Sequence, residues 1–187
     1  VSTLAGSGNA AYADGTGTSA SFNGPCGVAV DSSGNVYVAE YSNNRIRKIT
    51  ASGVVSTLAG SGYSGYADGT GTSASFSSPA GVAVDSSGTV YVADYDNNRI
   101  RKITASGMVS TLAGSGSPSY ADGTGTSASF NGPADVAVDS SGNVYVADKY
   151  NNRIRKITPS GVVSTLAGSG SQGYVDGTGT AASFSVP

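Results

Sequence analysis

The sequence predicts an all-β fold, a β-propeller built of four-stranded antiparallel blades, from three observations. First, the block Val-Ser-Thr-Leu-Ala-Gly recurs every 54 residues, beginning at Val1, Val55, Val109 and Val163. Second, each period holds four short runs rich in Val, Ile, Tyr and Thr, separated by turn signals. Third, no run places apolar residues at i, i+3, i+4 and i+7, as a helix would. Repeated short antiparallel strands are typical of propellers. A β-solenoid is the rival, but its coils would not need hairpin turns.

The period also divides the chain. Repeats 1–54, 55–108 and 109–162 are complete, and 163–187 is a partial fourth, which makes about three and a half repeats. We therefore expect one propeller segment over residues 1–187 and no second domain. Neither an initiator Met nor a signal peptide is visible, which suggests a processed or excised piece.

Four strands are predicted in each repeat. In the first repeat they span 28–31, 35–40, 45–50 and 54–60. Residues 1–6 are predicted to form a further strand before them. The turn Asp31-Ser32-Ser33-Gly34 suits a short hairpin, because glycine accepts a left-handed conformation and aspartate bonds its own backbone. We expect Asp31, Asp85 and Asp139 to cap these turns.

The four phenylalanines share one position in the repeat. They are Phe22, Phe76, Phe130 and Phe184, each the only large apolar side chain in a long polar loop. We interpret each one as a plug buried between neighbouring repeat units. The single Cys26 stands where the other copies have Ala80 and Ala134, so we expect a small, buried, structural residue and no disulfide.

Charge and hydropathy exclude two classes of partner. The net charge is −2 and only 12% of the residues are charged, which gives nucleic acid no basic surface to bind. No apolar run approaches the length that spans a membrane. We therefore expect no nucleic acid and no membrane among the partners.

The core of each repeat resembles a known blade. The segment Gly-Val-Ala-Val-Asp-Ser-Ser-Gly-Thr-Val-Tyr-Val-Ala-Asp at 81–94, followed by Asn-Asn-Arg-Ile-Arg-Lys-Ile at 97–103, resembles the NHL repeat. This propeller blade is named after an Asn-His-Leu motif, and the resemblance covers all three full repeats. Two departures stand out. Asn44, Asn98 and Asn152 stand where the family usually has His, and Asp135 replaces a Gly of the other copies.

The resemblance implies that relatives include metal-dependent lyases and lactonases, which place His or acidic ligands near the central channel. This chain has no His, one Glu and one Cys, so we expect no enzyme, no metal and no cofactor. The segment Asp14-Gly15-Thr16-Gly17-Thr18 matches a calcium loop poorly, and we expect a tight turn there.

The charged residues are expected to pair within the blades. Glu40, Asp94 and Asp148 end the second strand of each repeat, opposite Arg45, Arg99 and Arg153 at the start of the third. We predict ion pairs across these hairpins. The recurring run Arg-Ile-Arg-Lys at 45–48 is predicted to be a solvated strand face paired with Asp.

One side of the blades is the candidate binding face. In a meander, the long loop at 60–79 and the turn at 41–44 lie on the same side, where most differences among the copies fall. Harmless drift after duplication explains these differences equally well. The candidate residues are Tyr12, Asp14, Tyr41, Tyr66, Asp68, Tyr95, Asp96, Tyr120, Asp122, Lys149, Tyr150, Tyr174 and Asp176. Tyr12, Tyr66, Tyr120 and Tyr174 either stack on a sugar or peptide or pack against the neighbouring blade.

Three blades are too few to close a ring, because propellers have 4–8. We therefore expect self-association, as a head-to-tail homodimer, or membership of a longer propeller. The first functional hypothesis is a non-enzymatic binding or assembly scaffold with a protein or carbohydrate ligand. The alternatives are a subunit of an extracellular filament and a metal-dependent hydrolase or lyase of the NHL-like type. Composition and family resemblance favour an extracellular or secreted location.

Overall fold

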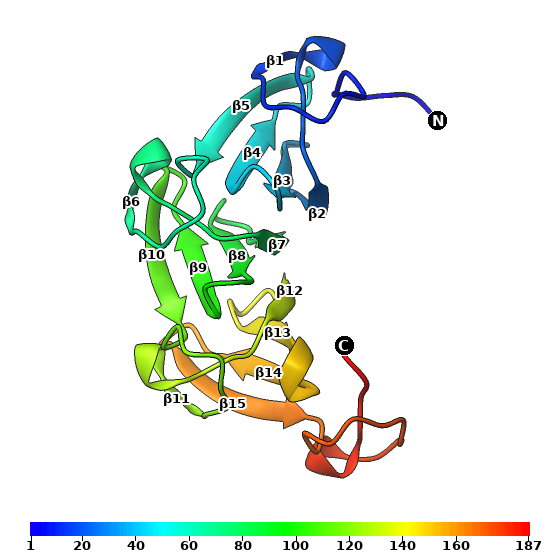
Figure 1. Cartoon of the computed structure of the whole chain (residues 1–187), viewed down its shortest axis with the longest axis vertical. Coiled ribbons are helices and arrows are strands. Elements are labelled where there is room, and N and C mark those ends of the chain that lie inside the picture. Colours follow the sequence, from blue (N-terminus) through cyan, green and yellow to red (C-terminus); the bar gives the residue numbers. More distant parts are fainter.

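The computed structural model describes all 187 residues and contains three five-stranded antiparallel sheets. The sheets follow one another along an arc, with the two termini at its opposite ends (Figure 1). Blade 1 consists of β1 (Gly15–Thr16), β2 (Pro25–Val30), β3 (Val36–Glu40), β4 (Arg45–Ile49) and β5 (Val54–Ala59). Blade 2 consists of β6 (Gly69–Thr70), β7 (Pro79–Val84), β8 (Val90–Asp94), β9 (Arg99–Ile103) and β10 (Met108–Ala113). Blade 3 consists of β11 (Gly123–Thr124), β12 (Pro133–Val138), β13 (Val144–Asp148), β14 (Arg153–Ile157) and β15 (Val162–Ala167).

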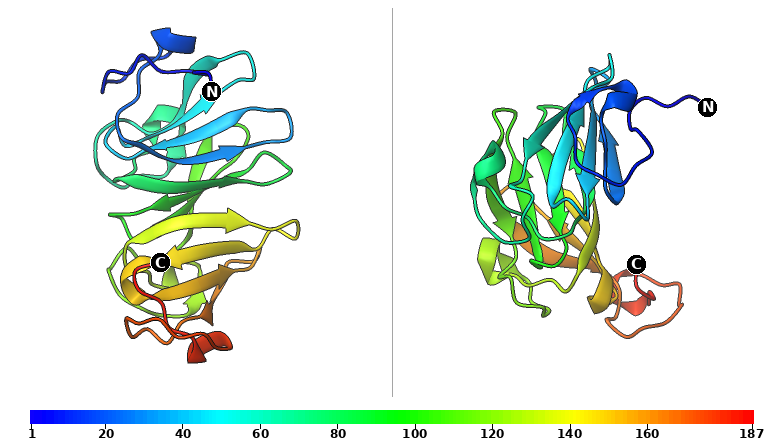
Figure 2. Two further views of the ribbon diagram at one scale, coloured as in Figure 1. Left: turned by 90° about the vertical axis from the view of Figure 1, so that its right-hand side faces the viewer. Right: turned by 45° about the horizontal axis from the view of Figure 1, so that its top comes forward.

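The strand order is the same in every blade: β1-β5-β4-β3-β2 in blade 1 and its equivalents in the others. The innermost strands β2, β7 and β12 lie side by side on the concave side of the arc, as Figure 2 shows. The four expected strands of each repeat are confirmed. The fifth strand, two residues long, was not expected, and the innermost strand begins earlier than predicted, at Pro25 in blade 1.

Residues 1–6 do not form the predicted strand. Their equivalents β5, β10 and β15 each pair with the strand that precedes them in the same blade, as β5 pairs with β4. No such strand precedes residues 1–6 within this chain, so their backbone has no ladder to join.

The first turn of each blade is built as expected. Gly34 has a φ of 77°, and Oδ1 of Asp31 accepts hydrogen bonds from the backbone N–H groups of Ser33 and Asn35, both at 2.9 Å. Asp85 and Asp139 accept the equivalent bonds in the other blades. These aspartates therefore cap the turns.

The hydrophobic core lies between blades. Phe76 is fully buried between Ala59 and Ile46 of blade 1 and Val90 and Val92 of blade 2. Phe130 is buried in the same way between blades 2 and 3. The plug interpretation is confirmed at these two positions, while Phe22 and Phe184 lie at the ends of the arc and are partly exposed.

The long loops stitch neighbouring blades together at the outer rim. Each passes through a 3₁₀ turn: η1 (Gly17–Ser19), η2 (Gly71–Ser73), η3 (Gly125–Ser127) and, after the last blade, η5 (Gly179–Ala181). Gly71 accepts a bond from the N–H of Gly60, at the end of blade 1, and donates to the carbonyl of Gly107 in blade 2. The loops run down the outer edge of each blade, where they add the fifth strand.

A second contact between blades comes from the asparagines that stand where the NHL repeat usually has His. Asn98 adopts a left-handed conformation with a φ of 52°, which Asn tolerates better than most residues. Its Oδ1 accepts a hydrogen bond of 2.9 Å from the N–H of Gly132, in the loop that leads into the next blade. Asn44 and Asn152 make the same contact to Ser78 and Val186. Asparagine here joins each blade to the following segment.

No helix in the structure has the length and apolar character that crossing a membrane would require.

Candidate functional site

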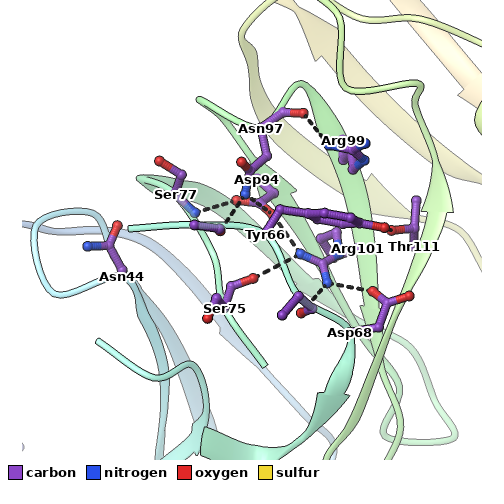
Figure 3. Close-up of polar contacts among 12 residues, drawn as sticks. Asn44, Tyr66, Asp68, Ser75, Ser77, Asp94, Asn97, Arg99, Arg101 and Thr111 are labelled. Carbon is purple, nitrogen blue, oxygen red and sulfur yellow. Dashed lines mark hydrogen bonds and ion pairs between the residues drawn. The ribbon is translucent and has the colours of Figure 1, made fainter. Parts of the chain in front are cut away.

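The structure separates the predicted binding residues into two groups. The first group surrounds a buried arginine in each blade, shown for blade 2 in Figure 3. Nη1 of Arg101 donates to Oδ2 of Asp94 at 2.8 Å, and Nη2 donates to Oδ1 of Asp68 at 2.7 Å. The same guanidinium also donates to the carbonyls of Ser75 and Ala67, at 3.1 and 2.9 Å. Arg101 therefore ties the long loop to strands β8 and β9.

This arrangement corrects the predicted ion pairs. Asp94 and Arg99 are neighbours across the ladder, but the carboxylate pairs with Arg101, two residues further along β9. Arg99 instead donates to the carbonyl of Ser115, at 2.8 Å, in the loop toward blade 3. Residues two apart share one face of a strand, so both arginines can reach Asp94. Arg101 is fully buried, so no water can hydrogen-bond to its guanidinium, which pairs with the Asp94 carboxylate instead. Arg99 is only partly buried. Glu40 pairs with Arg47, and Asp148 with Arg155, in the same way.

The recurring basic run is also not a solvated face. The pairing with Asp is correct, since Arg47, Arg101 and Arg155 bind Asp14, Asp68 and Asp122. However, all three arginines are fully buried. Each fills the space between its sheet and the loop that runs over it.

The carboxylates that end the second strand are buried with these arginines. Burial raises the pKa of Asp94, against the effect of hydrogen bonds from Asn97, the N–H of Ser77 and Arg101, which favour the charged form. Burial likewise raises the pKa of Asp148. Every oxygen of Asp94 has a partner within the chain, so we interpret this cluster as structural.

The loop tyrosines cover the arginines from outside. Tyr66 lies with its ring centre 3.9 Å from the guanidinium carbon of Arg99, and its hydroxyl is 3.0 Å from Oγ1 of Thr111. Tyr12 and Tyr120 repeat this geometry. These tyrosines therefore pack against their own blade and not against the neighbouring one. Tyr174 is 90% exposed, because no blade follows it to supply the arginines.

The second group forms an aromatic surface. The sequence named its tyrosines as candidates but did not predict that they contact one another. The three tyrosines come from the turns β3–β4, β8–β9 and β13–β14, and they are Tyr41, Tyr95 and Tyr150. Their ring centres are 6.2 Å apart in both successive pairs. Tyr95 donates a hydrogen bond of 2.8 Å to the hydroxyl of Tyr150, and Nζ of Lys149 lies 3.5 Å from the Tyr95 hydroxyl. We call Tyr41, Tyr95, Lys149 and Tyr150 the tyrosine cluster.

In the third repeat the tyrosine lies one position later than in the other two, and this shift creates the cluster. Lys149 occupies the position of Tyr41 and Tyr95, and Tyr150 follows it within a 3₁₀ turn, η4 (Lys149–Asn151). The displaced ring thereby reaches Tyr95 and also packs over Gly132. Burial and the Tyr150 hydroxyl raise the pKa of Tyr95, so its hydroxyl stays protonated as a donor. The candidate residues Tyr41, Tyr95, Lys149 and Tyr150 are brought together, and Asp96 lies exposed beside them.

The concave side of the arc carries Cys26 but no cluster of metal-binding side chains. No group of three or more His, Cys, Asp or Glu side chains lies close enough to hold a metal ion. Cys26 is exposed there, which corrects its expected burial, because the innermost strands face the open interior of the arc. Its sulfur lies 3.5 Å from the carbonyl oxygen of Ala80, and partial burial raises the pKa of the thiol. The raised pKa disfavours the reactive thiolate.

Comparisons with known proteins agree with the repeat structure. The NHL repeat model matches residues 22–49, 76–103 and 130–157. Over 83 residues, or 43% of this chain, the sequence is 40% identical to NHL repeat-containing protein 3 of Homo sapiens. Over 91 residues, or 48% of this chain, it is 37% identical to the chloroplastic protein SUPPRESSOR OF QUENCHING 1 of Arabidopsis thaliana. The matched segments span only 22% and 9% of these two proteins.

Solved structures share the fold over most of the chain. A protein of unknown function from Bacteroides thetaiotaomicron superposes with a TM-score of 0.71 at 26% identity, over 87% of this chain and 40% of that protein. An auxiliary nutrient binding protein from Bacteroides ovatus superposes with a TM-score of 0.69 at 21% identity, over 90% and 43%. Virginiamycin B lyase from Staphylococcus aureus gives 0.51 at 20%, over 75% and 40%. The NHL model matches each blade from its plug phenylalanine to the end of β4, β9 or β14. The chain therefore belongs to the NHL repeat family.

Proposed function

We propose that the chain is a non-enzymatic assembly and binding scaffold, in which two copies dock end to end. The observation that carries this proposal is the exposure of the two halves of the blade-to-blade interface at the ends of the arc. Val28 of blade 1 is 65% exposed, whereas its equivalents Val82 and Val136 are 5% and 6% exposed beneath the preceding blades. Apolar surface that is buried at every internal junction is therefore uncovered at the first blade.

The opposite end of the arc exposes the complementary half. Ala39 and Ile46 of blade 1 are fully buried against blade 2. Their equivalents in blade 3, Ala147 and Ile154, are partly exposed and line a shallow hollow together with Tyr145. Each copy therefore presents one face of each kind, which supports a head-to-tail contact with a second copy. Two copies would supply six blades, within the 4–8 that close a propeller.

The segment after blade 3 shapes the contact between copies. Residues 168–187 repeat the loop that precedes blade 1, with Tyr174, Asp176 and Phe184 in the positions of its Tyr, Asp and Phe. When two copies meet, only one of these two segments can occupy the outer edge of blade 1. The loop already attached to blade 1 has the advantage, since its Asp14 binds Arg47 at 2.6 Å. Residues 168–187 of the other copy are then displaced.

The tyrosine cluster is the ligand-binding part of the proposed scaffold. Tyr41 and Tyr150 expose ring surface, and hydroxyl groups and the Lys149 ammonium lie among the rings. Aromatic faces with adjacent donors suit a carbohydrate, whose apolar C–H faces stack on rings while its hydroxyls accept hydrogen bonds.

Absolute mass in solution tests the assembly. We expect light scattering behind a sizing column to give about twice the chain's 18.3 kDa. Val28→Asp places a charge on the exposed face of blade 1 and should shift the mass to that of one chain. Ser33→Asp, in an exposed turn, is the matched control and should behave as the unchanged protein. A ladder of larger masses would favour an open filament. A single-chain mass at every concentration would contradict the proposal.

A further inference from the structure

The innermost strands of neighbouring blades approach each other closely at one glycine position of the repeat. Blades 1 and 2 have Gly27 and Gly81 there, and blade 3 has Asp135. A Cβ atom placed on Gly81 would lie 2.5 Å from the Cα of Asp135 and 2.9 Å from the backbone nitrogen of Val136. Carbon atoms in contact are separated by about 3.5–4.0 Å, so this position has no room for a side chain.

The same restriction applies at the other internal junction. A Cβ on Gly27 would lie 3.0 Å from both the Cα of Gly81 and the nitrogen of Val82, and would meet the carbonyl oxygen of Ala80 more closely still. The neighbours at Gly27 are all backbone atoms of the next innermost strand; at Gly81 the added Cβ would also meet the Asp135 Oδ1, but the Cα of Asp135 and the nitrogen of Val136 are backbone atoms. The backbone atoms decide the outcome at both junctions. They cannot rotate away as a flexible side chain would, so a side chain here forces the two strands apart.

Asp135 carries the Cβ that both internal junctions exclude. Its place in the ladder is that of Gly27: it pairs with Ala147 as Gly27 pairs with Ala39. Asp135 is exposed and lines the hollow on the uncovered face of blade 3. Its Oδ1 accepts a bond of 2.9 Å from the N–H of Val136 and lies near Gly81 of the preceding blade, whereas its Cβ takes the place that Gly81 leaves empty in the second repeat. A blade docked on blade 3 in the internal geometry would place its own strand backbone against this Cβ.

We propose that Asp135 is a steric brake on end-to-end assembly: it keeps the innermost strand of a second copy from approaching blade 3 as closely as the blades within one chain approach each other. This inference rests on the proposed docking of two copies. The contact between copies then opens near the axis, while the apolar outer parts of the two faces still meet. It is weaker than the internal junctions and can dissociate.

Asp135→Gly tests the brake directly. Removal of the Cβ should allow the internal geometry and lower the dissociation constant of the dimer by about tenfold or more, measured by dilution in sedimentation equilibrium. Asp135→Ala keeps the Cβ but removes the carboxylate, and it should associate like the unchanged protein. If Asp135→Ala tightens the dimer as much as Asp135→Gly, the carboxylate and not the Cβ is the barrier, and the proposal is wrong.

The internal junction supplies a second test that does not depend on assembly. Gly81→Ala should lower the melting temperature of the chain, because the added Cβ meets the backbone of blade 3. Gly65→Ala is the matched control, since a Cβ there meets only the Ser75 side chain, at an ordinary 3.8 Å. Equal melting temperatures for the two variants would overturn the steric argument.

The outcomes separate this inference from the proposed function. If the unchanged protein dimerises and Asp135→Gly is no tighter, the inference alone fails. If the unchanged protein stays single while Asp135→Gly dimerises, the brake is supported and is stronger than proposed. If both remain single at every concentration, docking itself is wrong and the brake has nothing to act on.

Discussion

Arg101 and Asp94 form an ion pair of 2.8 Å between Nη1 and Oδ2, with neither side chain reached by solvent. The other blades repeat it with Arg47 and Glu40 at 2.7 Å, and with Arg155 and Asp148 at 2.8 Å. A buried ion pair adds little net stability, because desolvation opposes the attraction. Its effect is to specify one arrangement, since the same arginine also holds the long loop through Asp68.

Removal of one partner should therefore be costly. Arg101→Met leaves Asp94 buried without its counter-charge, and we expect a loss of about 3–5 kcal/mol in the free energy of unfolding, measured with urea. Lys102→Met, the next residue along β9, is only partly buried and should change the free energy by about 0.5 kcal/mol or less. A loss below about 1 kcal/mol in Arg101→Met would show that the pair does not order the blade.

The turn aspartates should make stability depend on pH. Hydrogen bonds from Asn143, from the N–H groups of Asn143 and Ser141, and from Tyr145 lower the pKa of Asp139 to about 2. The folded pKa lies below the unfolded value of about 3.9, so this contribution is present above pH 4 and is lost as the pH falls through about 2.

Asp139→Asn isolates this effect from the buried carboxylates, whose raised pKa values act in the opposite direction. The difference in melting temperature between the two proteins should be largest above about pH 4 and should vanish below about pH 2. A difference that is constant from pH 2 to pH 7 would show that the charge of Asp139 contributes nothing.

The left-handed asparagines should each have two separable roles. Asn98→Ala loses both the easily adopted left-handed backbone and the bond to Gly132, whereas Asn98→Gly loses only the bond. We expect Asn98→Ala to be less stable than Asn98→Gly by about 1 kcal/mol, and both to melt below the unchanged protein. If Asn98→Gly has the same melting temperature as the unchanged protein, the hydrogen bond between Gly132 and Asn98 does not contribute to stability.

Loss of the central ring should weaken carbohydrate binding at the tyrosine cluster. Tyr95→Ala removes the ring that contacts both Tyr41 and Tyr150, and we expect binding of a soluble gluco-oligosaccharide to weaken by about tenfold in calorimetry. Tyr63→Ala is the control, because Tyr63 is exposed and lies outside the cluster. An equal loss in both variants, or no binding by the unchanged protein, would contradict a sugar site.

Local patterns along the chain were enough to predict several features of the fold. The 54-residue period, the four main strands and the turns capped by Asp31, Asp85 and Asp139 follow from local pattern and turn chemistry. The burial of Phe76 and Phe130 was also predictable, because a large apolar side chain that recurs in a polar loop is stabilised only by packing between the blades. The resemblance to NHL blades depended on these same short-range patterns.

The contacts between residues far apart in the chain depend on how the blades and loops pack, and local pattern could not predict them. Arg99 and Arg101 lie on the same strand face, and burial beneath the loop, which no local pattern reveals, selects Arg101 for Asp94. Tyr150 of blade 3 reaches Tyr95 of blade 2 because the tyrosine lies one position later in the third repeat. The meaning of Asp135 likewise depends on how closely one blade approaches the next. Each of these outcomes is set by packing between segments, and strand periodicity carries no information about which segments become neighbours.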